Sequence, residues 1–481
     1  MLETQPSDRG RNPNPEASSQ RHGAVLAVAS VASFMVALDL LVVTTALDAI
    51  RRDLDVDAST LQWTVTAYGL CFASLLMAGA ALGNRLGRRR MLMIGLFVFV
   101  FGSVAAALSG GVGWLIAARV VQGAGSAIVL PVSLAIVASA YPPERRGAAI
   151  GTLEGITGLA VIAGPLVGGV ITERLAWEWI FWSNVPMGLA AIPFVYHLIE
   201  ETRSDSVRID FPGAGLVATG TFGLVWGLAR GNDVGWVSTE ATLAVVSGGA
   251  SWLAFLSWQR RATHPMLPLY LFRSRSFSCG AFAAASLSAA LYASVFVMAQ
   301  MLQITLGLDA LETGVRLVPW TATLIVVAPL AGRAGDRWGP RPVLVTGLVG
   351  SALGFSWLAV LVEPGVGYGT ILPPLLLMGV GVSAALPVSQ SAILGAAPES
   401  EMGTAAGVTN MLQEIGGAVG VAIAVAVFLL VGDYSTPSQA STGFAHALVA
   451  CAVLATIGAV GAAALPRRRD ELVEAAGSPP A

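Results

Sequence analysis

The feature that most constrains this chain is a series of long apolar runs that covers almost its whole length. Each run is about as long as the ~20 residues that an α-helix needs to cross a bilayer. About fourteen such spans are expected, at 24–47, 61–83, 91–110, 114–138, 148–171, 184–199, 212–230, 240–258, 277–306, 312–332, 342–362, 371–395, 404–432 and 444–465. Because lipid offers the backbone no hydrogen bonds, the prediction is an all-α polytopic membrane protein.

The scarcity of charge agrees with this prediction. Of 481 residues, 55% are hydrophobic and only 12% are charged, about half the charged share of a typical soluble protein. Charges this sparse cannot cover the surface of a globule. We therefore expect the lipid bilayer to surround most of the chain.

The basic residues exclude several kinds of chemistry. All 27 are arginines, so the lysine of an ATP-binding phosphate loop or of a Schiff base is missing. We therefore expect no enzyme and no cofactor, and an ion gradient as the energy source. The formal net charge of -2 argues against a nucleic-acid partner. Three scattered cysteines and four dispersed histidines predict no metal site.

The placement of the arginines predicts the orientation of the chain. With an even number of helices and a cytoplasmic N-terminus, most arginines fall on the cytoplasmic side, as the positive-inside rule requires. The exceptions are Arg51, Arg52, Arg174, Arg230 and Arg316 on the opposite side, and Arg119 within a helix. We expect both termini to be cytoplasmic. The first apolar run is too long for a signal peptide, and residues 1–22 have a composition typical of disorder.

Two short turns repeat a motif. Gly83–Arg89 and Gly335–Arg341 both read G-[ND]-R-x-G-x-R, as expected for a secondary transporter built from two related halves. The predicted units are a tail (1–22), a six-helix bundle (23–199), an inserted helix pair (200–259), a second six-helix bundle (260–465) and a tail (466–481). One interpretation is that the arginines of these turns only fix the orientation of the helices in the membrane. The other is that the turns act as gates. The candidate gating residues are Asn84, Arg85, Gly87, Arg88, Asp336, Arg337, Gly339 and Arg341.

An ordered set of motifs resembles the major facilitator superfamily, specifically its fourteen-helix drug:proton antiporter branch. The matching stretches are Ala80–Arg89, Leu38–Val43, Arg119–Gly123, Gly164–Gly169 and Trp177–Gly188. The chain departs from the branch pattern at Ala80, Asn84, Leu41 and Glu178. The resemblance implies two six-helix bundles with a two-helix insertion, and multidrug or antibiotic efflux driven by the proton motive force. With its aspartate replaced by Asn84, the first turn should hold more weakly than the turn at Asp336.

The stretch Gly164, Pro165, Gly168 and Gly169 combines a smooth helix face with a residue that lacks a backbone donor. Such a sequence favours close packing and a bend. The resemblance implies that this bend helps to seal the cytoplasmic side in exporters. Close packing alone explains the glycines equally well.

A first group of charges lies within the apolar runs, where each costs about 2.5–3.5 kcal/mol on insertion scales. Asp39 and Arg119 are expected at similar depth in the outer half of the membrane, where they could meet. One interpretation is a structural salt bridge. The other is that Asp39 exchanges a proton as its access to Arg119 and water changes.

Two further carboxyls are candidates for proton coupling. Glu414 is expected near the midplane, close in sequence to Asn410 and Gln413, as a cation contact or as a buried hydrogen-bonded carboxyl. Glu154 is expected nearer the cytoplasmic end, where it could simply reach toward water. Other candidates for a substrate cavity, more often contacts between helices, are Gln122, Tyr292, Gln300, Gln303 and Gln390.

Together these features predict a proton-coupled antiporter of the bacterial inner membrane that exports small amphipathic molecules and works as a monomer. Proton entry would supply about 2.3 kcal/mol per charge per 100 mV. A nutrient symporter on the same fold is the main alternative. A membrane enzyme would need a catalytic constellation, and a sensor would need a soluble signalling domain; neither feature is present in the sequence.

Overall fold

The computed structural model describes residues 15–466, except residues 57, 203–209, 236–237, 309 and 434. The described part is helical throughout, without strands, which confirms the predicted fold class. Twelve of its helices are long and apolar enough to cross a membrane. With α5 and α7 added, the helices account for the fourteen expected spans.

The first group of helices, here called the N-half, contains α1 to α7. Its elements are α1 (Pro15–Leu54), α2 (Ala58–Leu86), α3 (Arg88–Ala107), α4 (Val112–Ala140), α5 (Pro143–Arg174), α6 (Trp179–Trp182) and α7 (Asn184–Leu198). The expectation of a disordered segment up to residue 22 is wrong for residues 15–22, because α1 continues as a helix beyond its apolar run. Residues 1–14 lie outside the described residues.

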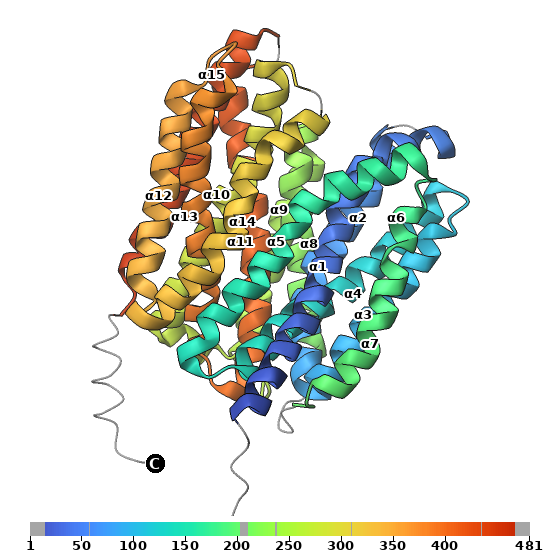
Figure 1. The fold of residues 1–481 in the computed structure, drawn as a ribbon, viewed down its shortest axis with the longest axis vertical. Helices are drawn as coiled ribbons and strands as arrows, with labels where there is room; N and C mark the ends of the chain where they lie inside the picture. The colour runs from blue at the N-terminus through green and yellow to red at the C-terminus, as the bar shows by residue number, and fades with distance from the viewer. Residues whose placement is uncertain are drawn as a thin grey trace, which may run out of the picture.

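The second group, the C-half, contains α10 to α15. Its elements are α10 (Arg275–Leu306), α11 (Ala310–Trp338), α12 (Pro340–Leu361), α13 (Tyr368–Gly395), the short helix η2 (Glu399–Glu401), α14 (Met402–Val431) and α15 (Pro437–Ala463). Figure 1 shows the two halves side by side, with the start of α1 and the end of α15 at one end of the bundle. This end is called the basal end below.

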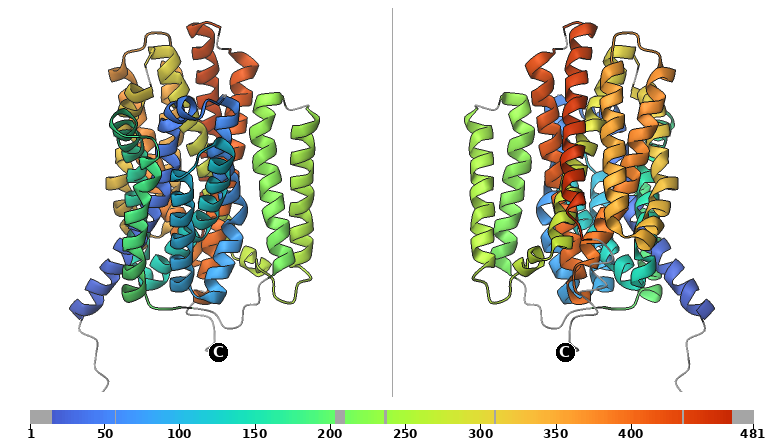
Figure 2. Two further views of the ribbon diagram at one scale, coloured as in Figure 1. Left: turned by 90° about the vertical axis from the view of Figure 1, so that its right-hand side faces the viewer. Right: turned by 90° about the vertical axis from the view of Figure 1, so that its left-hand side faces the viewer.

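The insert pair consists of α8 (Phe211–Val234) and α9 (Thr239–Gln259), followed by the 3-10 helix η1 (Leu269–Arg273). Figure 2 shows the pair standing beside the bundle. α8 packs against α2 of the N-half and α14 of the C-half. Near its start, Asp210 accepts hydrogen bonds from Trp258 (2.8 Å) and Gln259 (2.7 Å), so the two helices are joined by buried polar contacts.

Glycines determine how closely the two halves approach. A Cβ added to Gly151 of α5 would lie 2.3 Å from the carbonyl oxygen of Ala328 on α11, and one added to Gly332 would lie 2.0 Å from that of Gly147. Such distances leave no room for a side chain. The α5–α11 contact therefore depends on bare backbone, as expected where no hydrophobic force drives helices together in lipid.

Candidate functional site

A buried ion pair connects α1 with α4 in the N-half. Asp39 and Arg119 form a salt bridge and are 1% and 0% exposed. The contact that their expected depths allowed is therefore present. Because a buried charge is stable only when it is paired and hydrogen-bonded, the neighbours of this pair decide what it can do.

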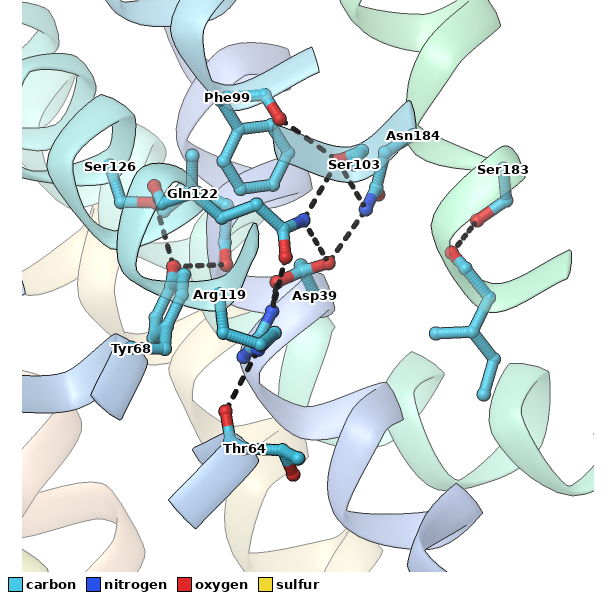
Figure 3. A network of polar contacts seen from close by, with 12 residues as sticks. Asp39, Thr64, Tyr68, Phe99, Ser103, Arg119, Gln122, Ser126, Ser183 and Asn184 are labelled. Carbon is cyan, nitrogen blue, oxygen red and sulfur yellow. Dashed lines mark hydrogen bonds and ion pairs between the residues drawn. The ribbon is translucent and has the colours of Figure 1, made fainter. Parts of the chain in front are cut away.

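The surrounding polar groups satisfy most of the two charges (Figure 3). Asp39 Oδ1 accepts hydrogen bonds from Gln122 Nε2 (3.1 Å) and Asn184 Nδ2 (2.7 Å). Arg119 donates to the Thr64 carbonyl oxygen (3.0 Å) and to Gln122 Oε1 (2.8 Å). Arg119 Nη2 has no partner among the described residues. The carboxylate is thus held by donors from α4 and α7 together.

Sequence reasoning had singled out Gln122 as a possible cavity residue, but it belongs to this buried network instead. It had not identified Asn184, Ser103 or Thr64 as partners. Ser103 Oγ accepts from Gln122 Nε2 at 2.8 Å and so extends the network to α3. Asn184 lies in a stretch already recognised as a motif, which was the available signal for its role.

Tyr68 of α2 separates the ion pair from the centre of the molecule. Its ring lies 4.2 Å from the Arg119 guanidinium carbon, and its hydroxyl is hydrogen-bonded to Ser126 at 2.8 Å. The same tyrosine lines a central cavity. Tyr68 therefore contacts the Asp39–Arg119 network and also lines that cavity.

The central cavity has a volume of about 210 Å³ and lies between the two halves. Helices α1, α2, α4 and α5 line it from the N-half, and α10, α13 and α14 line it from the C-half. One part of its wall is apolar, made by residues such as Leu40, Phe72 and Leu134. The other part is polar and contains two carboxyl groups.

Those carboxyls come from opposite halves. Glu414 of α14 accepts a hydrogen bond from the Tyr292 hydroxyl at 3.3 Å. Glu154 of α5 lies within hydrogen-bonding reach of the Gln390 side chain of α13. No arginine or histidine is among the described residues that line the cavity. The alternative in which Glu154 reaches toward water at the membrane surface is therefore wrong, because its side chain faces this interior space.

The remaining cavity candidates divide into two groups. Asn410, Gln413, Tyr292 and Gln390 line the cavity, as expected. Gln300 and Gln303 are not among its lining residues, although they lie on the same helix as Tyr292. Hydropathy could place α10 in the membrane but could not tell which face of it meets the other half.

At the basal end, Asp336 connects α11 to α5 of the other half. Its carboxylate oxygens accept hydrogen bonds from the backbone N–H groups of Gly147 (2.8 Å) and Ala148 (2.9 Å). An added Cβ on Gly147 would lie 2.5 Å from Asp336 Oδ1. A glycine is thus needed for the carboxylate to approach the helix backbone.

A matching contact is made by the first copy of the repeated turn. Asn84 of α2 donates to the Thr404 hydroxyl of α14 at 3.0 Å, and Arg88 donates to the Glu399 carbonyl oxygen at 3.2 Å. A Cβ on Gly403 would lie 2.0 Å from Asn84 Oδ1. Each copy of the motif therefore contacts the opposite half. The weaker hold expected at Asn84 stays a prediction.

The other residues of the two turns have more local positions. Gly87 and Gly339 have φ angles of 104° and 88° and precede α3 and α12. This backbone conformation favours glycine. Arg341 contacts the Leu465 carbonyl oxygen within the C-half at 3.4 Å. Arg85 is only half-buried, and Arg337 lies in the last turn of α11. The described contact of Arg341 is thus local to the C-half, and the gating roles of Arg85 and Arg337 stay predictions.

The glycine stretch of α5 packs within the N-half. A Cβ on Gly164 would lie 2.7 Å from the Cβ of Leu41 on α1, whereas Gly169 has open space around it. The glycines at which α5 meets α11 are Gly147, Gly151, Gly155 and Gly158. Of Gly164, Gly168 and Gly169, Gly164 therefore has the described contact with α1. The expected role of this stretch in the cytoplasmic seal stays a prediction. Pro165 is within the continuous helix α5.

The helical fold and the acidic residues buried within it are typical of a membrane transporter. Comparison with known families identifies which one. The family model described as Major Facilitator Superfamily matches residues 29–421 and 280–480. The chain belongs to this superfamily. It is therefore a multi-pass membrane transporter and not an enzyme.

Among characterised relatives, resistance and export proteins are prominent. The Tetracenomycin C resistance and export protein of Streptomyces glaucescens is 32% identical over 401 residues, covering 83% of this chain and 74% of the relative. The Methylenomycin A resistance protein of Bacillus subtilis is 30% identical over 440 residues, covering 91% and 93%. The chain is thus similar to proteins named for antibiotic resistance and export.

Solved structures support the fold at lower sequence similarity. The proton:xylose symporter XylE matches with a TM-score of 0.63 at 17% identity, covering 92% of this chain and 95% of that chain. The human organic anion transporter MFSD10 matches with a TM-score of 0.62 at 14% identity, covering 90% and 99%. Both are similar in architecture only.

Proposed function

We propose that this transporter is a proton-coupled antiporter that exports small amphipathic molecules across the bacterial inner membrane, with no cofactor and as a monomer. The observation that carries the proposal is the placement of Glu154 and Glu414. They face one cavity from opposite halves, and no described cation lines that cavity. Carboxyls in such a site are favourable when they carry protons or bind a cation. One set of groups can therefore exchange protons for cargo.

The proposed orientation places the basal end in the cytoplasm. The arginine-rich ends of α2 and α11 and the beginnings of α5 and α10 all lie at this end. Arginines concentrate on the cytoplasmic side of membrane proteins. The basal contacts of Asp336 and Asn84 then close the cytoplasmic side.

Asp39 and Arg119 are proposed as a second proton-coupling element. Tyr68 contacts Arg119 and also lines the cavity, so a movement of Tyr68 would change the access of protons to Asp39. Alternating access supplies such a movement, because the halves rearrange around a fixed central site. The protonation of Asp39 would then depend on the conformation of the transporter. The protonation of Glu154 and Glu414 would depend on whether cargo is bound.

The test uses inside-out membrane vesicles in which a proton gradient is formed and monitored with a pH-sensitive dye. Addition of an exported compound should dissipate the gradient, and the compound should accumulate inside. Tetracenomycin C and methylenomycin A, named in two relatives, begin the compound panel. Accumulation that persists after both the pH difference and the voltage are removed would exclude proton coupling.

A proton-coupled symporter is the alternative function, and the fold alone accommodates it, as the similarity in architecture to XylE illustrates. The two differ in direction. An exporter raises the tolerance of expressing cells to a toxic compound, whereas a symporter supports growth on a scarce nutrient. The similarity to resistance and export proteins favours export.

A further inference from the structure

We infer that the central cavity selects cargo carrying a protonated primary or secondary amine, bound through its N–H groups between Glu154, Gln390 and Glu414. The inference rests on the proposed function, because it names the substrate class of the same cavity. It goes further in requiring N–H donors and not positive charge alone. Quaternary ammonium compounds of the same shape should bind poorly.

The first observation is an acceptor without a donor. Gln390 is 2% exposed and lines the cavity, and its Oε1 has no hydrogen-bond partner among the described residues. A buried polar atom left unpaired costs about 1–3 kcal/mol. Because Gln390 lines the cavity, a cargo N–H group that reaches its amide oxygen would supply the missing donor.

The second observation is the chemistry beside that oxygen. The Gln390 side chain lies next to the Glu154 carboxyl, and Glu414 faces the same space from α14. Ionised carboxylates are acceptors only. Three acceptor groups that converge without a described cation match an ammonium group, which has two or three N–H donors and one positive charge. A quaternary ammonium supplies the charge and no donors.

The third observation is the position of Tyr292. The Tyr292 hydroxyl donates a hydrogen bond to Glu414. The Tyr292 ring lies so close to Gly417 that a Cβ added there would be only 1.8 Å from the ring atom Cδ2. Gly417 thus lets the tyrosine lie flat against α14. The Tyr292 hydroxyl thus orients the Glu414 carboxylate. The other acceptor positions of that carboxylate stay open to cargo.

The apolar lining accounts for the rest of the ligand. Leu40, Phe72, Leu130 and Leu134 of the N-half line the same cavity. Burial of hydrocarbon against them contributes about 25 cal/mol per Å² of apolar surface. The fitting cargo is therefore an apolar or aromatic body that ends in a protonated amine.

The test is equilibrium binding to the purified full-length protein in detergent, without any gradient. A panel of arylalkylamines with different apolar bodies is compared, compound by compound, with their N,N,N-trimethyl analogues. Each amine should bind about ten- to a hundredfold more tightly than its quaternary partner, as expected for hydrogen bonds to charged groups. Equal affinities across the pairs, or no binding by any amine of the panel, would overturn the inference.

Variants assign the preference to the site. Gln390→Leu should remove most of the discrimination between the paired compounds, and Glu414→Gln with Glu154→Gln should weaken the amines at least tenfold. Gln303→Leu is the matched control, because Gln303 lies on α10 away from the cavity lining. If discrimination survives in Gln390→Leu, the inference is wrong. Since no proton gradient is present, these results are independent of whether transport is proton-coupled.

Discussion

At the scale of single residues, Asp39 is a charge held on several sides by other side chains. It is paired with Arg119 and accepts hydrogen bonds from Gln122 and Asn184 in a site with almost no exposure. Its contact with Arg119 could be anticipated from sequence, because the places of the two residues along their helices suggest a similar depth. The identity of its amide partners could not, because they come from helices whose relative rotation depends on packing.

Replacement of Asp39 by asparagine should reduce proton-driven export to the background of empty vesicles. The amide cannot carry the proton and leaves Arg119 buried without its counter-charge. Export in proteoliposomes with an imposed pH gradient is the measurement, with the amount of inserted protein as its control. Full proton-driven export by Asp39→Asn would contradict the proposed role.

Replacement of Asn184 by alanine should lower stability by about 1–3 kcal/mol, because Asp39 loses a buried donor. The change is read from thermal unfolding of the purified protein. Asn410→Ala is the comparison, since the Asn410 side chain bonds only to the Ala406 carbonyl oxygen of its own helix among the described contacts. Equal destabilisation by both variants would argue against a special role for Asn184.

At the scale of helices, the basal contacts come in two related copies. The stretch Pro142–Gly147 leads into α5 and ends just before Ala148, whose N–H group binds Asp336. The stretch Pro398–Gly403 leads through η2 into α14 and ends just before Thr404, the partner of Asn84. This second repeat was not predicted from the sequence, because few of its side chains are distinctive. The partners of Glu154 could not be predicted for a related reason: hydropathy does not report which face of α5 meets the cavity.

Replacement of Gly147 or Gly403 by alanine should open the basal end. The added methyl group would collide with Asp336 or Asn84. In a background where the three native cysteines are replaced, a Ser391→Cys reporter in the basal pocket should react with a water-soluble maleimide several times faster. Gly215→Ala, which has open space around it, should leave the labelling rate unchanged. An unchanged rate in both gate variants would show that these glycines do not control closure.

At the scale of the whole molecule, transport requires that the two halves separate at the basal end. Asn84 and Thr404 are in contact across the halves, so a cysteine pair at these positions can be joined by oxidation. The joined protein should lose transport almost completely and regain it on reduction. Each single cysteine variant should be insensitive to the oxidant. Undiminished transport by the cross-linked protein would mean that this contact persists through the cycle.

The insert pair touches a helix from each half, since α8 meets both α2 and α14 and Trp226 stacks on Trp63 with ring centroids 4.8 Å apart. Any rocking of the bundles must therefore shear at least one of these surfaces. The pair also shields the α2–α14 flank from the surrounding hydrocarbon, so an oily molecule dissolved in the bilayer would meet the seam between the bundles along the α5–α11 flank.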